Sequence, residues 1–215
     1  HSLDRRQRQM CIRDRRVYVQ NVASFAGLLD QQIEVNGIGT LSVDTAYGGD
    51  SFVTVRAHDL GFQITPDEAR DLVEVGKLIT KAANDQLKFH HPYNKDWNHF
   101  SFCQIHTDLE ARNGVKAYKN TVVIEPGKLD RSPTGTGISA RMAILHARKL
   151  LDIGETIVAH SIIDSSFEGK ILNTEMIGEM LAIKPELSGR AWITGTHQYL
   201  LDHYDPWPQG YRTVS

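Results

Sequence analysis

One segment of the chain combines the residue types that a small-molecule site needs. Residues 130–137 read Asp-Arg-Ser-Pro-Thr-Gly-Thr-Gly, which brings a carboxylate, hydroxyl groups and two glycines together ahead of an apolar run with helical spacing. Gly135 and Gly137 let the backbone approach a ligand closely because they carry no Cβ atom. The free N–H groups in the first turn of a helix and the positive end of its dipole attract anions. The segment therefore predicts a binding site for a carboxylate; an ordinary capped loop before a core helix is the alternative.

Two elements would position this segment. Residues 121–124 are predicted to form a strand that leads into it, and residues 138–151 a helix that leaves it. Pro133 disfavours a helical conformation at Ser132, so the chain is expected to turn there before the helix begins.

The rest of the chain alternates between short apolar runs and turn residues. Thr65, Pro66 and Glu68 form a capping pattern that predicts a helix over residues 65–87. A hairpin is expected around residues 36–39. A loop is predicted at 24–30, a tight turn at 46–49, and further strands at 17–22, 52–55, 100–105, 157–163, 167–172, 181–183 and 191–195, the last one ending in a turn. Short strands around two long helices favour the α+β class.

The run DRSPTGTGISARMA, residues 130–143, resembles the second catalytic motif of the proline racemase family, which includes hydroxyproline epimerases and trans-3-hydroxy-L-proline dehydratases. Four further segments match in the same order, at 21–25, 35–52, 161–171 and 191–211. The resemblance implies a diaminopimelate-epimerase-like fold, with a barrel-like sheet around a central helix in each of two domains. The helix at 138–151 would be the central helix of the second domain.

The resemblance also implies roles for individual residues. Racemases of the family carry cysteine where this chain has Thr134, and two such groups, one per domain, exchange the α-proton on opposite faces of the substrate. A threonine hydroxyl is far less acidic than a thiol, which disfavours two-base inversion. Thr134 would instead hydrogen-bond the substrate or its departing hydroxyl. Asp130 would bind the ring amine, and the N–H groups of Gly135 and Thr136 the carboxylate.

Simpler roles for the same residues stay open. Asp130 could cap the turn, and Thr134 could be the N-cap of the helix, a position that threonine often occupies. His106 is a further candidate to face the ligand. Cys103 is expected to be a small buried hydrophobe, since nothing near it in the sequence would stabilise a thiolate.

Three functions are consistent with these features. The first is cofactor-independent dehydration of trans-3-hydroxy-L-proline to Δ1-pyrroline-2-carboxylate. The second is epimerisation of 4-hydroxyproline or racemisation of proline, and the third is a non-catalytic amino-acid-binding relic. The presence of Thr134 favours the first over the second. The partner is expected to be a small molecule, hydroxyproline or proline, and a homodimer is possible within the family.

Composition excludes several other classes. Of 215 residues, 40% are apolar and 23% charged, as in globular proteins with a buried core, and the net charge of −2 gives no basic surface for nucleic acid. No apolar run is long enough to span a bilayer.

The two cysteines, Cys11 and Cys103, cannot form a disulfide framework, which favours the cytoplasm. Ten histidines occur without a metal-binding motif, so no metal is expected, and the family resemblance implies that no cofactor is needed.

The ends of the chain carry expectations of their own. A basic run such as residues 1–15 is usually a solvated tail. Residues 5–15, however, resemble the in-frame translation of a sequencing adaptor, and we expect segment 1–15 to be non-native. By the resemblance, residues 16–30 would be a linker from a first domain, 31–194 the second domain, and 195–215 a segment returning toward the first. The first catalytic motif of the family lies in that first domain, so the 215 residues alone are expected to have no turnover.

Overall fold

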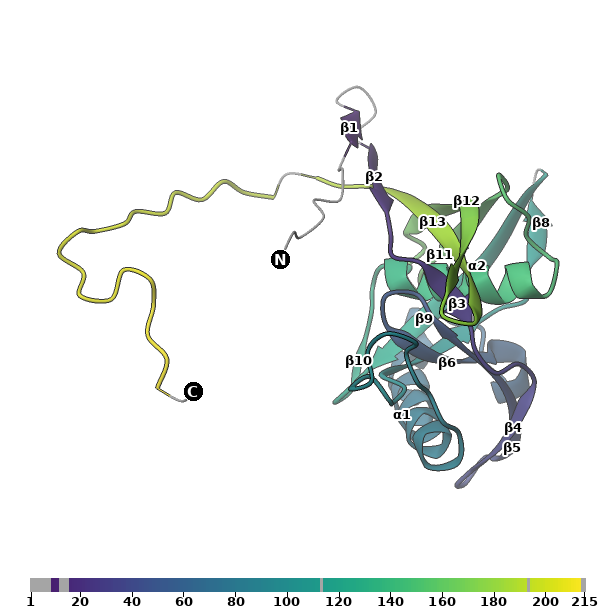
Figure 1. Ribbon diagram of the computed structural model, residues 1–215. Helices are drawn as coiled ribbons and strands as arrows, with labels where there is room; N and C mark the ends of the chain where they lie inside the picture. The colour runs from purple at the N-terminus through teal and green to yellow at the C-terminus, as the bar shows by residue number, and fades with distance from the viewer. Residues whose placement is uncertain (1–8, 12–15, 113, 193, 214–215) are drawn as a thin grey trace.

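The computed structural model describes residues 9–11, 16–112, 114–192 and 194–213 (Figure 1). The strands are β1 (Gln9–Cys11), β2 (Arg16–Gln20), β3 (Ser24–Ala26), β4 (Gln31–Val35), β5 (Gly39–Tyr47), β6 (Ser51–Arg56), β7 (Phe102–His106), β8 (Glu110–Arg112), β9 (Val115–Ile124), β10 (Lys128–Leu129), β11 (Thr156–His160), β12 (Ser166–Ile177) and β13 (Met180–Arg190). The α-helices are α1 (Ala69–Gln86) and α2 (Gly135–Ala147).

The sheet closes on itself around α2. Hydrogen-bonded neighbours follow the order β13-β12-β11-β9-β7-β6-β5-β3, and β3 pairs with both β5 and β13. Within this path β6–β7 and β9–β11 are parallel, whereas the other neighbours are antiparallel. Helix α2 contacts β3, β5, β6, β12 and β13, so it lies inside the ring (Figure 1). The predicted α+β class and the barrel-like sheet around a central helix are confirmed.

Helix α2 is buried on all sides. Residues 137–145 are without exception buried, so this helix has no polar face. One cluster packs it against the β9, β11 and β12 side of the ring through Ile138, Met142, Leu145, Tyr118, Ile157, Ala159 and Ile171. A second cluster packs it against β6 and β9 through Ala140, Ile144, Phe52 and Val122. Beyond its C-terminal end, Arg148 binds Asp30 at 2.8 Å and Asp44 at 2.7 Å.

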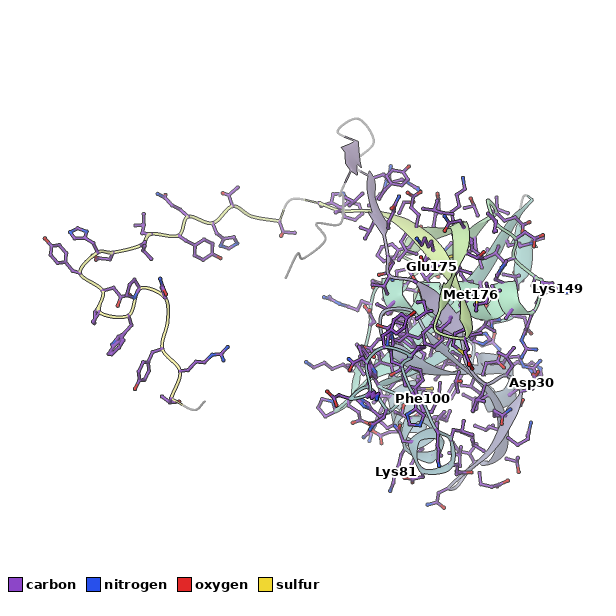
Figure 2. All side chains as sticks on the ribbon, viewed as in Figure 1. Asp30, Lys81, Phe100, Lys149, Glu175 and Met176 are labelled. Atoms are coloured by element: carbon purple, nitrogen blue, oxygen red, sulfur yellow. The ribbon has the colours of Figure 1, made fainter. Side chains whose placement is uncertain are left out.

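Helix α1 covers the outer face of the sheet. The chain enters it through a 3₁₀ turn at Pro66–Glu68, where Thr65 and Glu68 form the predicted capping box. A stripe of buried residues faces β7 and β9, namely Leu72, Gly76, Ile79, Ala82 and Ala83. Figure 2 shows Lys81 on the outer side of this helix. The predicted helix over residues 65–87 is thus confirmed as amphipathic, with Leu87 as its C-cap.

Gly76 brings α1 close to the sheet. A Cβ atom at this position would lie 2.7 Å from the Cβ of Val123 in β9, inside van der Waals contact. The glycine lowers the intrinsic stability of the helix by about 1 kcal/mol relative to alanine, and close packing on the strand offsets that cost.

Several sequence-based boundaries were wrong. The predicted loop at 24–30 contains strand β3, which its sequence does not show because it forms by pairing with β5 and β13. Helix α2 occupies residues 135–147 rather than 138–151, and the expected turn at 46–49 begins only after Tyr47. Strand β13 ends at Arg190, so Ala191 and Trp192 are not in the strand predicted at 191–195; Ile193 lies outside the described residues.

The described N-terminal strands pair with the sheet, whereas the described residues after β13 lie apart from it. Residues 16–30, expected as a linker, contain β2 and β3, both paired with β13; what this segment connects stays a prediction. Residues 9–11 form β1, which pairs with β2, and the rest of 1–15 lies outside the described residues. After β13 the described residues up to 213 form no helix or strand and lie exposed, apart from the body (Figures 1 and 2).

His106 and Cys103 are core residues of β7. The His106 side chain is 3% exposed, and burial lowers the pKa of its imidazole well below the usual value, so the ring is neutral. Its Nδ1 lies 2.9 Å from the Thr107 carbonyl oxygen, to which it donates in one neutral tautomer. Cys103 is fully buried, and burial raises the pKa of its thiol, as expected for a structural cysteine. No helix in the described part of the chain has the length and apolar character of a membrane span.

Replacement of Gly76 by alanine is expected to lower the free energy of unfolding by about 1–2 kcal/mol, because the overpacking against Val123 exceeds the gain in helix propensity. Urea denaturation measures the change. Asp85→Ala, at an exposed position of the same helix, is the control and should stay within about 0.5 kcal/mol of the parent. A Gly76→Ala protein as stable as the parent would show that α1 can move away from the strand.

His106 should make stability depend on pH. The unfolded chain binds a proton at His106 near pH 6.5, whereas the folded chain does so only at much lower pH. The contribution of His106 to stability is therefore fully present well above pH 6.5 and is lost as the pH drops through and below 6.5, by up to about 1.4 kcal/mol per pH unit. Urea unfolding at several pH values should give a smaller slope for His106→Gln. His58→Gln, at a side chain 90% exposed, should keep the parent slope, and equal slopes for all three proteins would contradict the assignment.

Candidate active site

The segment between β10 and α2 folds into a compact turn around Asp130. Its Oδ1 accepts a hydrogen bond from the Ser132 N–H at 2.8 Å, and its Oδ2 accepts one from the Thr134 hydroxyl at 2.8 Å. The Ser132 hydroxyl oxygen accepts from the Thr134 N–H at 3.1 Å. Two of the predicted site residues, Asp130 and Thr134, are therefore in direct contact, and Asp130 does organise the turn.

Thr134 occupies the N-cap position of α2 without capping it. Its hydroxyl turns back to Asp130, and its side chain makes no capping hydrogen bond to the helix. Its backbone has φ 58° and ψ 99°, a region that β-branched residues rarely adopt. Such a conformation costs on the order of 1–3 kcal/mol and persists only where surrounding contacts enforce it.

The first helical turn of α2 directs its backbone N–H groups toward the loop around Asp130. The first i→i−4 bond of the helix runs from Ile138 N–H to the Thr134 carbonyl at 2.8 Å, so the N–H groups of residues 135–137 precede the helical ladder. Gly135 and Thr136 are half-buried, whereas Gly137 is buried. The first turn contains no acidic side chain. The two predicted N–H donors are thus at a helix N-terminus that suits an anion.

The turn at Gly48 and Gly49, called the glycine turn below, joins β5 to β6 and fixes the position at which α2 begins. A Cβ atom at Gly48 would lie 2.5 Å from the Ala140 nitrogen, so only glycine fits against the helix there. Asn21 links the two parts, since its Nδ2 donates to the Gly48 carbonyl at 2.8 Å and to the Ser139 hydroxyl at 2.9 Å. Residues far apart in the sequence therefore set the position of the first turn.

Three contacts hold the turn from the sheet side. The Asp130 N–H donates to the Val122 carbonyl at 3.0 Å, and the Ser165 hydroxyl donates to the Arg131 carbonyl at 3.2 Å. The Asn120 side chain donates through Nδ2 to the Pro133 carbonyl at 3.1 Å. Sequence reasoning missed Asn21, Asn120 and Ser165. A buried asparagine beside the apolar run of β9 was the one available signal, since asparagine is depleted in strands.

His106, the histidines as metal ligands and the cavity beside β9 are the remaining candidates. His106 is in the core of β7, and in the described part of the chain no hydrogen bond joins it to the turn around Asp130. No cluster of three or more His, Cys, Asp or Glu side chains that could hold a metal occurs among the described residues. A cavity of about 530 Å³ near β9 and β11 does not include the turn either; it is lined by Gln63, Thr107, Glu110, Ala117, Tyr118, Lys119, His160 and Asp164.

The chain is similar to two solved structures of larger proteins. One is a probable proline racemase from Agrobacterium radiobacter K84 with bound carbonate, 30% identical with a TM-score of 0.79, covering 92% of this chain and 57% of that one. The other is a hydroxyproline epimerase from Agrobacterium vitis with bound trans-4-hydroxy-L-proline, 32% identical with a TM-score of 0.78, covering 92% and 56%. This chain thus spans a little over half the length of these relatives.

The sequence match is equally broad. Residues 4–212 match the sequence model described as proline racemase. The matched range contains the turn around Asp130, the glycine turn at Gly48 and the whole closed sheet. Together with the two structural matches, this shows that the chain belongs to the proline racemase family.

Proposed function

We propose that this chain supplies one half of a cofactor-independent active site that dehydrates trans-3-hydroxy-L-proline to Δ1-pyrroline-2-carboxylate. The observation that carries the proposal is Thr134, which stands at the helix N-terminus with its hydroxyl bound to a carboxylate. A threonine hydroxyl with a pKa far above neutrality does not carry the α-proton, whereas it does hydrogen-bond a substrate. Dehydration needs one base, so it tolerates threonine at this position.

The substrate carboxylate would bind the N–H groups of Gly135 and Thr136. These two groups precede the helical ladder and lie at the positive end of α2. Loss of the α-proton puts negative charge on the α-carbon and its carboxylate, and fixed N–H donors stabilise that charge more in the transition state than in the ground state.

The substrate ring amine would bind Asp130. Each oxygen of this carboxylate accepts one hydrogen bond within the turn and keeps acceptor capacity for a charged N–H donor. Because the Thr134 proton points to Asp130, the Thr134 oxygen presents lone pairs to the substrate and would accept from its ammonium or its 3-hydroxyl.

The proposed reaction is an elimination followed by tautomerisation. A base removes the α-proton, the electron pair forms the bond between the α- and β-carbons, and the bond from carbon 3 to oxygen breaks. The protonated base returns its proton to the departing hydroxyl, which leaves as water. The resulting enamine then becomes the cyclic imine. Cys103 is too deeply buried to act as this base. By the family resemblance, the base is a cysteine of a first domain, within the length of the relatives that this chain does not cover.

Epimerisation or racemisation is the second candidate. The observation in its favour is that the two similar structures are described as a probable proline racemase and a hydroxyproline epimerase. It requires a proton carrier on each face of the substrate, and Thr134 would have to be one of them.

The protein encoded by the intact gene, whatever the source locus encodes on either side of these 215 residues, is expected to form imine from trans-3-hydroxy-L-proline. It should not invert trans-4-hydroxy-L-proline or L-proline, since Thr134 carries no proton. Imine formation and optical rotation, followed separately for the three substrates, measure this. The 215-residue chain alone is expected to have no turnover. Changing rotation without imine would establish the second candidate, and binding without either reaction would establish an amino-acid-binding relic.

Thr134→Cys is expected to add exchange of the substrate α-proton with solvent deuterium from the face that Thr134 contacts. A thiol at a helix N-terminus ionises near neutral pH and can carry a proton. Thr134→Val is the matched control: it has the same shape without the hydroxyl, so it should lower the dehydration rate by about 10²-fold and add no exchange. Deuterium incorporation read by mass spectrometry tests both variants. The absence of new exchange in a folded Thr134→Cys protein would mean that residue 134 does not face the α-carbon.

A further inference from the structure

Asn120 is a buried polar residue in the middle of a strand. Its side chain is 0% exposed, and it lies in β9 opposite His106 of β7. Nδ2 donates to the Pro133 carbonyl at 3.1 Å, whereas Oδ1 has no hydrogen-bond partner among the described protein groups. A buried acceptor without a partner lowers stability, so an apolar residue would suit the strand better. Within the described part of the chain, the bond to Pro133 is the one interaction that explains an asparagine here.

That bond holds one end of a single peptide group. The Pro133 carbonyl and the Thr134 N–H belong to the same planar unit. The carbonyl accepts from Asn120, and the N–H donates to the Ser132 hydroxyl at 3.1 Å. Both polar ends of the peptide are thus fixed, one by the sheet and one by the turn. The orientation of this plane sets φ of Thr134, which is 58°.

Of the two bonds at this peptide, the one from the sheet is the one that the turn cannot provide for itself. The bonds among Asp130, Ser132 and Thr134 are local and would move together if the peptide plane rotated. Asn120 belongs to the rigid central sheet, where β9 pairs with β7 and β11. It therefore ties a strained residue to a fixed frame, as strained functional residues require.

We propose that Asn120 is a positioning residue, which holds the Pro133–Thr134 peptide so that the Thr134 hydroxyl and the first N–H groups of α2 keep their direction. The catalytic part of this inference rests on the proposed function of Thr134. Asn120 acts through the peptide and does not touch the substrate.

The first test is kinetic and uses the protein of the intact gene. Asn120→Leu, or Asn120→Ala if the leucine variant does not fold, removes the donor and should lower kcat by about 10- to 100-fold, because a small misplacement of a catalytic group has such effects. Thr121→Val is the matched control. Thr121 is the next residue of β9, its buried Oγ1 also lacks a partner, and alternation places it on the other face of the sheet. This control should retain the parent kcat.

A double-mutant cycle separates positioning from a general loss of structure. If Asn120 acts in part through the Thr134 hydroxyl, the effect of Asn120→Leu on kcat should be several-fold smaller in a Thr134→Ala background, and the part that remains reports the N–H groups of α2. An undiminished effect in that background, or parent activity in both Asn120 variants, would overturn the proposal.

The second test does not depend on activity. Hydrogen exchange of the 215-residue chain should show the hydrogen-bonded amides of Thr134 and Ile138 exchanging at least about 10-fold faster in the Asn120 variants, with α1 unchanged and Thr121→Val equal to the parent. Equal exchange of these two amides in all proteins, or faster exchange throughout the chain, would refute the positioning role. If the intact protein does not act on hydroxyproline, the proposed function fails, and the exchange result still decides the role of Asn120.

Discussion

The pairing of β3 with both β5 and β13 is the contact on which the rest of the structure depends. Three residues, Ser24–Ala26, join the two ends of the strand path and turn an open sheet into a ring. A closed ring has an interior, and α2 fills it with side chains that are buried on every side. Because a helix in this place cannot shift without opening the sheet, its N-terminal turn is held at a fixed position on the ring.

This arrangement explains how the turn around Asp130 keeps an unfavourable conformation. Thr134 has a positive φ and a β-branched side chain, a combination that would relax if the helix start were free. Asn21 and the glycine turn hold the helix start from one side, and Asn120 and Ser165 hold the turn from the other. The stability of the closed sheet thus maintains local strain at the place where a carboxylate would bind.

Under the proposed function, the same scaffold serves more than one reaction of the family, and the difference rests on one side chain. The relatives are described as a racemase and an epimerase, and this chain shares their fold over 92% of its length. At residue 134 it has a hydroxyl bound to Asp130 in a position where, by the resemblance, racemases have a thiol. A helix N-terminus stabilises the substrate carboxylate in either case, but only a group with a pKa near neutrality carries a proton back and forth.

The sequence by itself determined the parts of this protein that depend on local pattern. Thr65 and Glu68 predicted where the helical segment of α1 begins. Residues 36–39 predicted the β4–β5 hairpin, and the run at 130–137 predicted a turn that leads into a helix N-terminus. The tertiary structure alone decided where distant segments meet. Strand β3 forms only because β5 and β13 lie on either side of it, and the Nδ2 groups of Asn21 and Asn120 find partners far along the chain. Hydrogen bonds across such separations leave no periodic trace in a sequence, because each depends on the closure of the whole sheet.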